Sequence, residues 1–183
     1  MRKFLILAFA GALLSGCLAK KATPYTYYEL KYQQKSCIQA GIKRRNIFID
    51  NVAATDLVDR RDILIVDFRN RTRFASDAKF ITMPSEMVYK ALIDAAFSTC
   101  GLNPIFVPEE KDLRLKTNVV ALQVNGDQAV ITIAYEILDA ISSKTSGIIT
   151  KQVFVPDPSS QSIFNAMNLV LNQAIDEILR AIQ

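Results

Sequence analysis

The sequence predicts an α+β fold, in which a mainly antiparallel sheet of about seven strands is covered on one face by two amphipathic helices. Two segments, 83–100 and 160–182, have apolar residues at helical spacing. The remaining apolar runs have strand length and are rich in β-branched and aromatic residues. Asn125-Gly126 separates two of these runs, and this dipeptide is the strongest short-range signal for a β-hairpin.

Four strands are predicted before the first helix. Tyr and Thr enrichment with rough alternation indicates the first strand, and a continuous apolar run indicates that the third lies centrally in the sheet. The four predicted strands are 25–32, 47–52, 63–68 and 73–81. The polar segment 33–45 is expected to form a loop around Cys37.

The first helix is predicted to begin at Pro84, which is tolerated in a first turn, and to stop before Gly101. Residues 102–107 are a short strand or an extended link. A three-strand meander is then expected, with strands 113–124, 128–139 and 145–155. The second helix follows Ser159 or Ser160 as its cap, and its broad apolar stripe is expected to face the core.

Composition limits the chemistry that the chain can perform. The 183 residues include no His, which is the commonest general base and metal ligand. Carboxylate pairs such as Asp59/Asp62 and Glu109/Glu110 lie in polar connections and are interpreted as solvated side chains. The sequence has no Gly-rich phosphate loop and no Cys/His cluster. We therefore predict no enzyme activity, no catalytic residue, no metal site and no cofactor.

The N-terminus has the pattern of a bacterial lipoprotein signal. Arg2 and Lys3 precede a short apolar run, and Leu14-Ser15-Gly16-Cys17 then matches the lipobox, in which the cysteine thiol is acylated and the chain is cut before it. This predicts a signal peptide over 1–16, a lipidated tether over 17–24 and a single periplasmic α+β domain over 25–183. The alternative is a retained anchor helix, although about 20 apolar residues are needed to span a bilayer.

Loss of Arg2 and Lys3 with the signal would lower the formal charge of +4 by two, leaving a nearly neutral chain. No nucleic-acid partner is therefore predicted. Cys37 and Cys100 remain as an even pair in an oxidising compartment. Either they form a disulfide, which would close a loop of about 64 residues and stabilise the fold by roughly 4 kcal/mol, or they are two separate buried thiols.

Five arginines gather around the third predicted strand and its two ends: Arg60, Arg61, Arg69, Arg71 and Arg73. They could contact anionic head groups or an acidic partner, or they could form a basic rim that keeps a sheet edge soluble. Four tyrosines lie in the first predicted strand, at positions 25, 27, 28 and 32. They either line a lipid groove or pack an edge strand.

Several short motifs together resemble the ABC-type transport auxiliary lipoprotein component family. After the lipobox come Tyr27-Tyr28-Glu29-Leu30, then Ile47-x-Ile49 in a predicted strand, then Leu57-Val58-Asp59-Arg60-Arg61-Asp62-Ile63. Phe80 through Pro84-Ser85-Glu86 resembles the segment that precedes the family's first helix, although the family usually has Trp where Phe80 aligns. The terminal helix also matches in place.

The resemblance implies a non-enzymatic, lipid-anchored periplasmic accessory subunit of an MCE-type (mammalian cell entry) ABC transporter, which moves phospholipids between the inner and outer membranes. Its implied partners are the membrane through the Cys17 anchor, an MCE-domain protein, the ABC permease and ATPase, and phospholipid. Leu18 after Cys17, in place of Asp, favours the outer over the inner membrane. The alternative function is a structural one, as an outer-membrane assembly lipoprotein such as a pilotin or a barrel partner.

Overall fold

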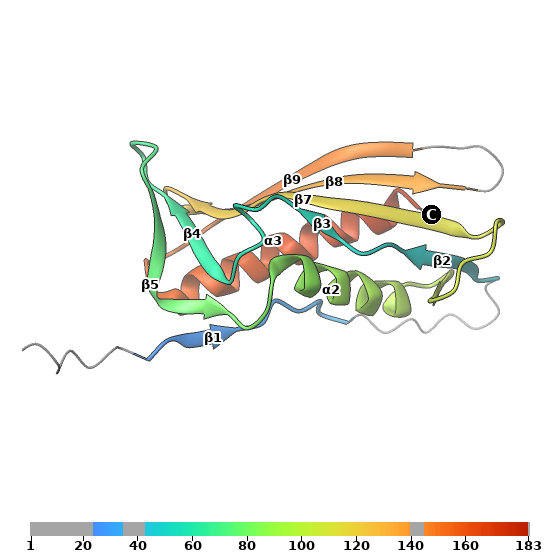
Figure 1. The fold of residues 1–183 in the computed structure, drawn as a ribbon, viewed down its shortest axis with the longest axis horizontal. Coiled ribbons are helices and arrows are strands. Elements are labelled where there is room, and N and C mark those ends of the chain that lie inside the picture. Colours follow the sequence, from blue (N-terminus) through green and yellow to red (C-terminus); the bar gives the residue numbers. More distant parts are fainter. Residues whose placement is uncertain (1–23, 35–42, 140–144, 183) are drawn as a thin grey trace, which may run out of the picture.

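The computed structural model describes residues 24–34, 43–139 and 145–182. These residues form one nine-stranded sheet and two long helices (Figure 1). The strands are β1 Thr26–Tyr28, β2 Arg45–Ile49, β3 Ala53–Ala54, β4 Asp62–Val66, β5 Thr72–Phe80, β6 Leu102–Ile105, β7 Leu113–Asn125, β8 Gln128–Leu138 and β9 Thr145–Phe154. The helices are α2 Pro84–Ser98 and α3 Ser160–Arg180.

β7 is the longest strand and the centre of the sheet. Along one of its edges, β2, β3 and β4 follow one another and run parallel to it, and β8 pairs antiparallel along the other edge. The three parallel registers place Ile47 opposite Leu113, Ala53 opposite Asn118 and Leu64 opposite Gln123. The chain from β2 to β4 is therefore a single interrupted strand alongside β7.

The remaining strands extend the sheet outward from this centre. β9 pairs antiparallel with β8, β5 antiparallel with β4, β1 parallel with β5, and β6 parallel with β2. The α+β class with two helices is confirmed, but the predicted mainly antiparallel sheet of about seven strands is wrong in detail. Five of the eight described pairings are parallel. Parallel partners lie far apart in sequence and leave no local turn signal.

A β-bulge in β7 keeps its apolar residues on one face. Leu115 and Val119 point to the core before the bulge, which lies between Val119 and Ala121, and Leu122 and Val124 point to the core after it. Because side chains alternate with a period of two, the extra residue moves the buried positions from odd to even numbers. The opposite face of β7 is mostly exposed.

The two helices lie on the same side of the sheet and contact each other (Figure 1). α3 packs against β8 and β9, and α2 packs against β2, β3 and β6. Ser159 caps α3, because its side chain accepts a hydrogen bond from the Ser162 N–H. The buried positions of α3 are Ile163, Ala166, Met167, Val170, Leu171, Ala174, Ile175, Ile178 and Leu179. The predicted core-facing stripe of this helix is confirmed.

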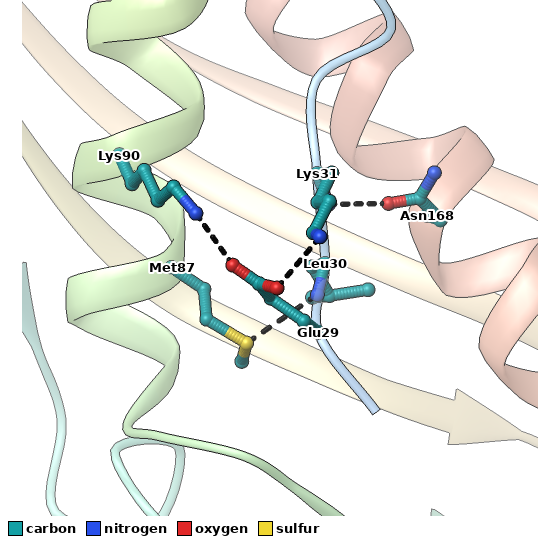
Figure 2. Close-up of polar contacts among 6 residues, drawn as sticks. All are labelled: Glu29, Leu30, Lys31, Met87, Lys90 and Asn168. Carbon is teal, nitrogen blue, oxygen red and sulfur yellow. Dashed lines mark hydrogen bonds and ion pairs between the residues drawn. The ribbon is translucent and has the colours of Figure 1, made fainter. Parts of the chain in front are cut away.

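An extended segment after β1 runs between α2 and α3 (Figure 2). Leu30 is buried in it, at 1% exposure. The Lys31 N–H donates to Asn168 Oδ1 at 2.8 Å, and the Gln33 N–H donates to Asn172 Oδ1 at 2.7 Å. Asn172 in turn donates to the Lys31 carbonyl at 2.9 Å. The prediction that one strand spans 25–32 is therefore wrong beyond Tyr28, because helix side chains satisfy this backbone in place of a neighbouring strand.

Glu29 links the same segment to α2 (Figure 2). Its carboxylate lies 2.8 Å from the Lys31 ammonium and 2.6 Å from the Lys90 ammonium. The Leu30 N–H donates to Met87 Sδ at 3.4 Å. Hydrogen bonds from Lys31 and then Lys90 hold the pKa of Glu29 below its usual value of 4.5. The segment is thus attached to both helices.

The predicted hairpin at Asn125-Gly126 is present, and its two-residue loop begins at Gly126. Asn125 pairs with Gln128, so the loop residues are Gly126 and Asp127. Of these, only Gly126 has a positive φ, of 61°, which is the pattern of a type II′ turn. A Cβ at Gly126 would lie 2.4 Å from the Phe68 ring, so this aromatic side chain covers the turn.

Replacing Gly126 with Ala should lower the free energy of unfolding by about 1–2 kcal/mol, because the new Cβ meets a positive φ and the Phe68 ring. Urea unfolding measures the change. The double variant Gly126→Ala/Phe68→Ala separates the two causes, since it removes the ring but keeps the φ. The 83% exposed Phe68 side chain can already move aside in Gly126→Ala, so the clash with the ring accounts for only part of the loss. We therefore expect the double variant to recover only that part, because the cost of the positive φ remains. An unchanged stability of Gly126→Ala would contradict the assigned turn.

Replacing Glu29 with Gln should lower stability at neutral pH by about 0.5 kcal/mol, the usual size for an exposed ion pair. Because the pKa of folded Glu29 is depressed, its contribution is present above pH 4.5 and is lost as the pH falls through the folded pKa. The difference between wild type and Glu29→Gln should therefore shrink in acid. Unfolding curves over a pH series, with the exposed Glu110→Gln as the control, test this. A difference that stays constant with pH would argue against the two ion pairs.

Candidate docking surface

The five predicted arginines are all exposed and separate into two groups. Arg60 and Arg61 precede β4, whereas Arg69, Arg71 and Arg73 lie in the β4–β5 turn and at the start of β5. The five residues of β4 stand between the groups. The structure thus does not gather all five arginines on one edge.

The turn arginines have local partners. Asp67 accepts hydrogen bonds from the Arg69 N–H at 2.8 Å, from the Arg71 N–H at 3.0 Å and from Arg71 Nε at 2.7 Å. These bonds, the Arg71 backbone bond foremost, hold the pKa of Asp67 below its usual value. Asn70 completes the tight turn with a φ of 57°. Arg69 and Arg71 therefore stabilise the β4–β5 turn.

Arg73 lies beside a different feature, a hollow of about 280 Å³ at the end of the core between the sheet and α3. Its apolar wall includes Ile65, Phe154 and Ile163, and Asp157 lines it as well. Hydrogen bonds from Ser159 and Ser162 lower the pKa of Asp157, so it is ionised at neutral pH. Because the hollow is lined by both signs of charge, it has no net preference for an anion.

The other two arginines belong to a surface that we call the aromatic–cationic surface: Tyr25, Tyr27, Arg60, Arg61, Phe74 and Lys79. In each of three pairs, a cation lies over an aromatic ring. Lys79 Nζ lies 4.5 Å from the Tyr25 ring centroid, Arg61 Cζ lies 5.1 Å from that of Tyr27, and Arg60 Cζ lies 5.1 Å from that of Phe74.

Strand pairing brings these residues together. β1 and β5 place Tyr27 beside Lys79, and β4 and β5 place Asp62 beside Lys79, with 3.0 Å between carboxylate and ammonium. The hydrogen bond to Asp62 raises the pKa of Lys79, so this ammonium stays charged. Arg61 Nε also donates a hydrogen bond to the Phe80 carbonyl at 3.1 Å. This bond holds the Arg61 side chain against the end of β5.

The tyrosines divide between the surface and the interior. Tyr28 stacks on Phe164 of α3 with ring centroids 4.8 Å apart, and Tyr32 is buried, with its hydroxyl 2.6 Å from Asp176. Burial raises the pKa of Tyr32. Tyr25 and Tyr27 remain 44% and 51% exposed. Neither sequence hypothesis holds for all four tyrosines, since two pack inside and two form an outward face.

Sequence reasoning missed Lys79 and Phe74. Both lie in β5, and only its pairing with β1 and β4 brings them next to the tyrosines and arginines. The alternation of Tyr25 and Tyr27 along a strand is the one signal that could have placed two of these side chains on a common face.

Within the described ranges, no group of three or more His, Cys, Asp or Glu residues could hold a metal ion. None of the helices described is long and apolar enough to cross a membrane. Cys17 and Cys37 lie outside the described residues. Cys100 is disulfide-bonded, and its pairing with Cys37 stays a prediction.

No family model and no curated protein matches this chain. Its fold is similar to that of an uncharacterized protein of known crystal structure, with a TM-score of 0.73 and 12% identity over 87% of this chain and 99% of that chain. It is also similar to protein XCC0632 from Xanthomonas campestris, a DUF330 protein, with a TM-score of 0.71 and 12% identity over 84% and 92% of the two chains.

A third similar structure is the hypothetical protein CT253 from Chlamydia trachomatis, with a TM-score of 0.53 and 9% identity over 76% of this chain and 96% of that chain. At these identities the similarity concerns the fold alone. A similar overall fold therefore also occurs in solved proteins of very different sequence.

Peptide mapping without reductant should recover Cys100 joined to Cys37. Reduction should then lower the melting temperature, because the bond closes a loop of about 64 residues, worth roughly 4 kcal/mol. Cys37→Ser and Cys100→Ser should lower it by the same amount as each other, since each removes the same bond. Recovery of Cys37 as a free thiol would exclude the pairing.

Proposed function

We propose that this chain is a lipid-anchored, periplasm-facing accessory subunit of an MCE-type ABC transporter that moves phospholipids between the inner and outer membranes. It acts by binding partners and not by catalysis. The observation that supports this most directly is the aromatic–cationic surface, because it lies where the chain enters the domain from the proposed lipid anchor. The transporter itself is suggested by the family resemblance of the sequence motifs.

The tether is short enough to keep this surface close to the anchor. Pro24 is seven residues after Cys17, and an extended chain covers at most about 3.6 Å per residue, or about 25 Å here. Tyr25 follows directly, and β1 begins at Thr26. An acylated Cys17 would therefore hold Tyr25 and Tyr27 near the membrane. Leu18 after Cys17 favours the outer membrane as the site of anchoring.

A structural role in outer-membrane assembly is the second candidate, and β9 is the observation that favours it. In the part of the chain that the structure describes, this ten-residue strand pairs with β8 alone. Its other edge presents backbone N–H and carbonyl groups that a strand from a barrel protein could pair with. Exposed Ile148 and Phe154 add apolar area along it.

Purification of the full chain from crosslinked cells should recover an MCE-domain protein and an ABC ATPase. The proposed role depends on the anchor, so Cys17→Ala should abolish this recovery. Mass spectrometry of the wild-type N-terminal peptide provides the control, because it should begin at an acylated Cys17.

Two results would count against this role. Recovery of a barrel protein or secretin without an MCE protein would favour the assembly function. A wild-type chain that keeps residues 1–16 would favour a retained anchor helix over acylation.

A further inference from the structure

We infer that the aromatic–cationic surface binds the anionic head-group region of a phospholipid bilayer, so that the outer side of β1, β5 and β4 lies against the membrane. This inference rests on the proposed function in one respect, the acylation of Cys17, and it adds a second membrane contact to that anchor. The occupant is the bilayer surface itself, and an acidic protein partner is the competing outcome of the test.

The residue types match the interface between water and hydrocarbon. Tyr25 and Tyr27 are about half exposed, and tyrosine is enriched at head-group depth because its ring is apolar and its hydroxyl is polar. Phe74 is 39% exposed and Ile81, two residues beyond Lys79, is 52% exposed. These four side chains therefore provide exposed apolar area on adjacent strands.

The charges match an anionic surface. When Asp62 is included, the aromatic–cationic surface has three cations, Arg60, Arg61 and Lys79, and one carboxylate. Each cation lies over a ring, so a positive charge for the phosphates and an aromatic ring for the interface occur together in each of the three pairs.

The shape also favours a bilayer. β1, β5 and β4 are neighbours in the sheet, so the three cation–ring pairs spread over adjacent strands instead of converging on one point. Tyr28, with the opposite orientation in β1, stacks on Phe164 of α3 and closes the inner side. Tyr25, Tyr27 and Phe74, on the outer side, are exposed in the part of the chain that the structure describes.

The anchor and the surface can act on the same membrane. An acyl anchor plus a basic patch is a common pairing of membrane signals, because the second contact sets orientation and adds affinity. Tyr25 is eight positions after Cys17, so the extended reach is at most about 29 Å. Acylation would thus hold the aromatic–cationic surface close to the head groups.

The absence of Trp from the sequence allows a direct test. Tyr27→Trp introduces a single fluorophore on the surface, and Phe106→Trp introduces one beyond β6, at the other end of the strand order from β1. The full acylated chains are reconstituted in vesicles of phosphatidylcholine, with or without phosphatidylglycerol, that contain brominated lipid. We expect quenching of Trp at position 27, stronger with phosphatidylglycerol, and little quenching at position 106.

Charge variants identify the cause of that quenching. In the Tyr27→Trp background, Arg60→Gln/Arg61→Gln/Lys79→Gln should lower the preference for phosphatidylglycerol roughly tenfold or more. The matched control, Lys43→Gln/Arg44→Gln/Lys111→Gln, removes three exposed cations elsewhere and should leave the preference unchanged. Arg60→Lys/Arg61→Lys keeps the charge and should also retain the preference.

The inference is overturned if an acylated chain shows equal quenching at positions 27 and 106, or if the triple neutralisation has no effect. Burial of position 27 by an acidic protein in the purified complex, without quenching by lipid, overturns it as well. If mass spectrometry finds no acylation, the proposed anchor fails separately. Sedimentation of that unacylated full chain with phosphatidylglycerol vesicles then decides the inference, since binding supports it and lack of binding refutes it.

Discussion

Hydrogen bonding along both edges of β7 is the constraint on which the rest of the structure depends. One edge accepts β2, β3 and β4 in sequence, and the other accepts β8, which in turn holds β9. β5 and β1 are then placed by their pairing to β4 and β5. The register of β4 on β7 therefore determines where the aromatic–cationic surface forms, although no residue of that surface belongs to β7.

The N-terminal chain connects this surface to the helical layer. Tyr27 faces outward, whereas Tyr28, the next residue, is half-buried and stacks inward on Phe164. Directly after β1, the backbone enters the space between α2 and α3, where Asn168 and Asn172 satisfy its polar groups. A segment without regular secondary structure thus holds the surface in a fixed relation to both helices.

Features that depend on local sequence could be predicted, and features that depend on long-range pairing could not. Pro84 and the apolar stripe of 160–182 defined the helices, and Asn125-Gly126 located the hairpin, because each signal lies within the element it defines. The parallel partners of β7 lie about 60 residues away from it and have no such signal. For the same reason the arginines were found as a sequence cluster, whereas Lys79 and Phe74 became visible only once β5 was paired.

The position of the extended segment also determines how the domain would bear mechanical load. With Cys17 acylated, as proposed, a force applied through the anchor enters the domain at the N-terminal end of β1. β1 is only three residues long, and behind it Leu30 and Tyr32 are buried between the helices. A pull on the anchor would have to draw these two side chains out of the core after β1 detaches. The buried segment would then act as a stop that keeps the domain folded while its contacts with the membrane are made and broken.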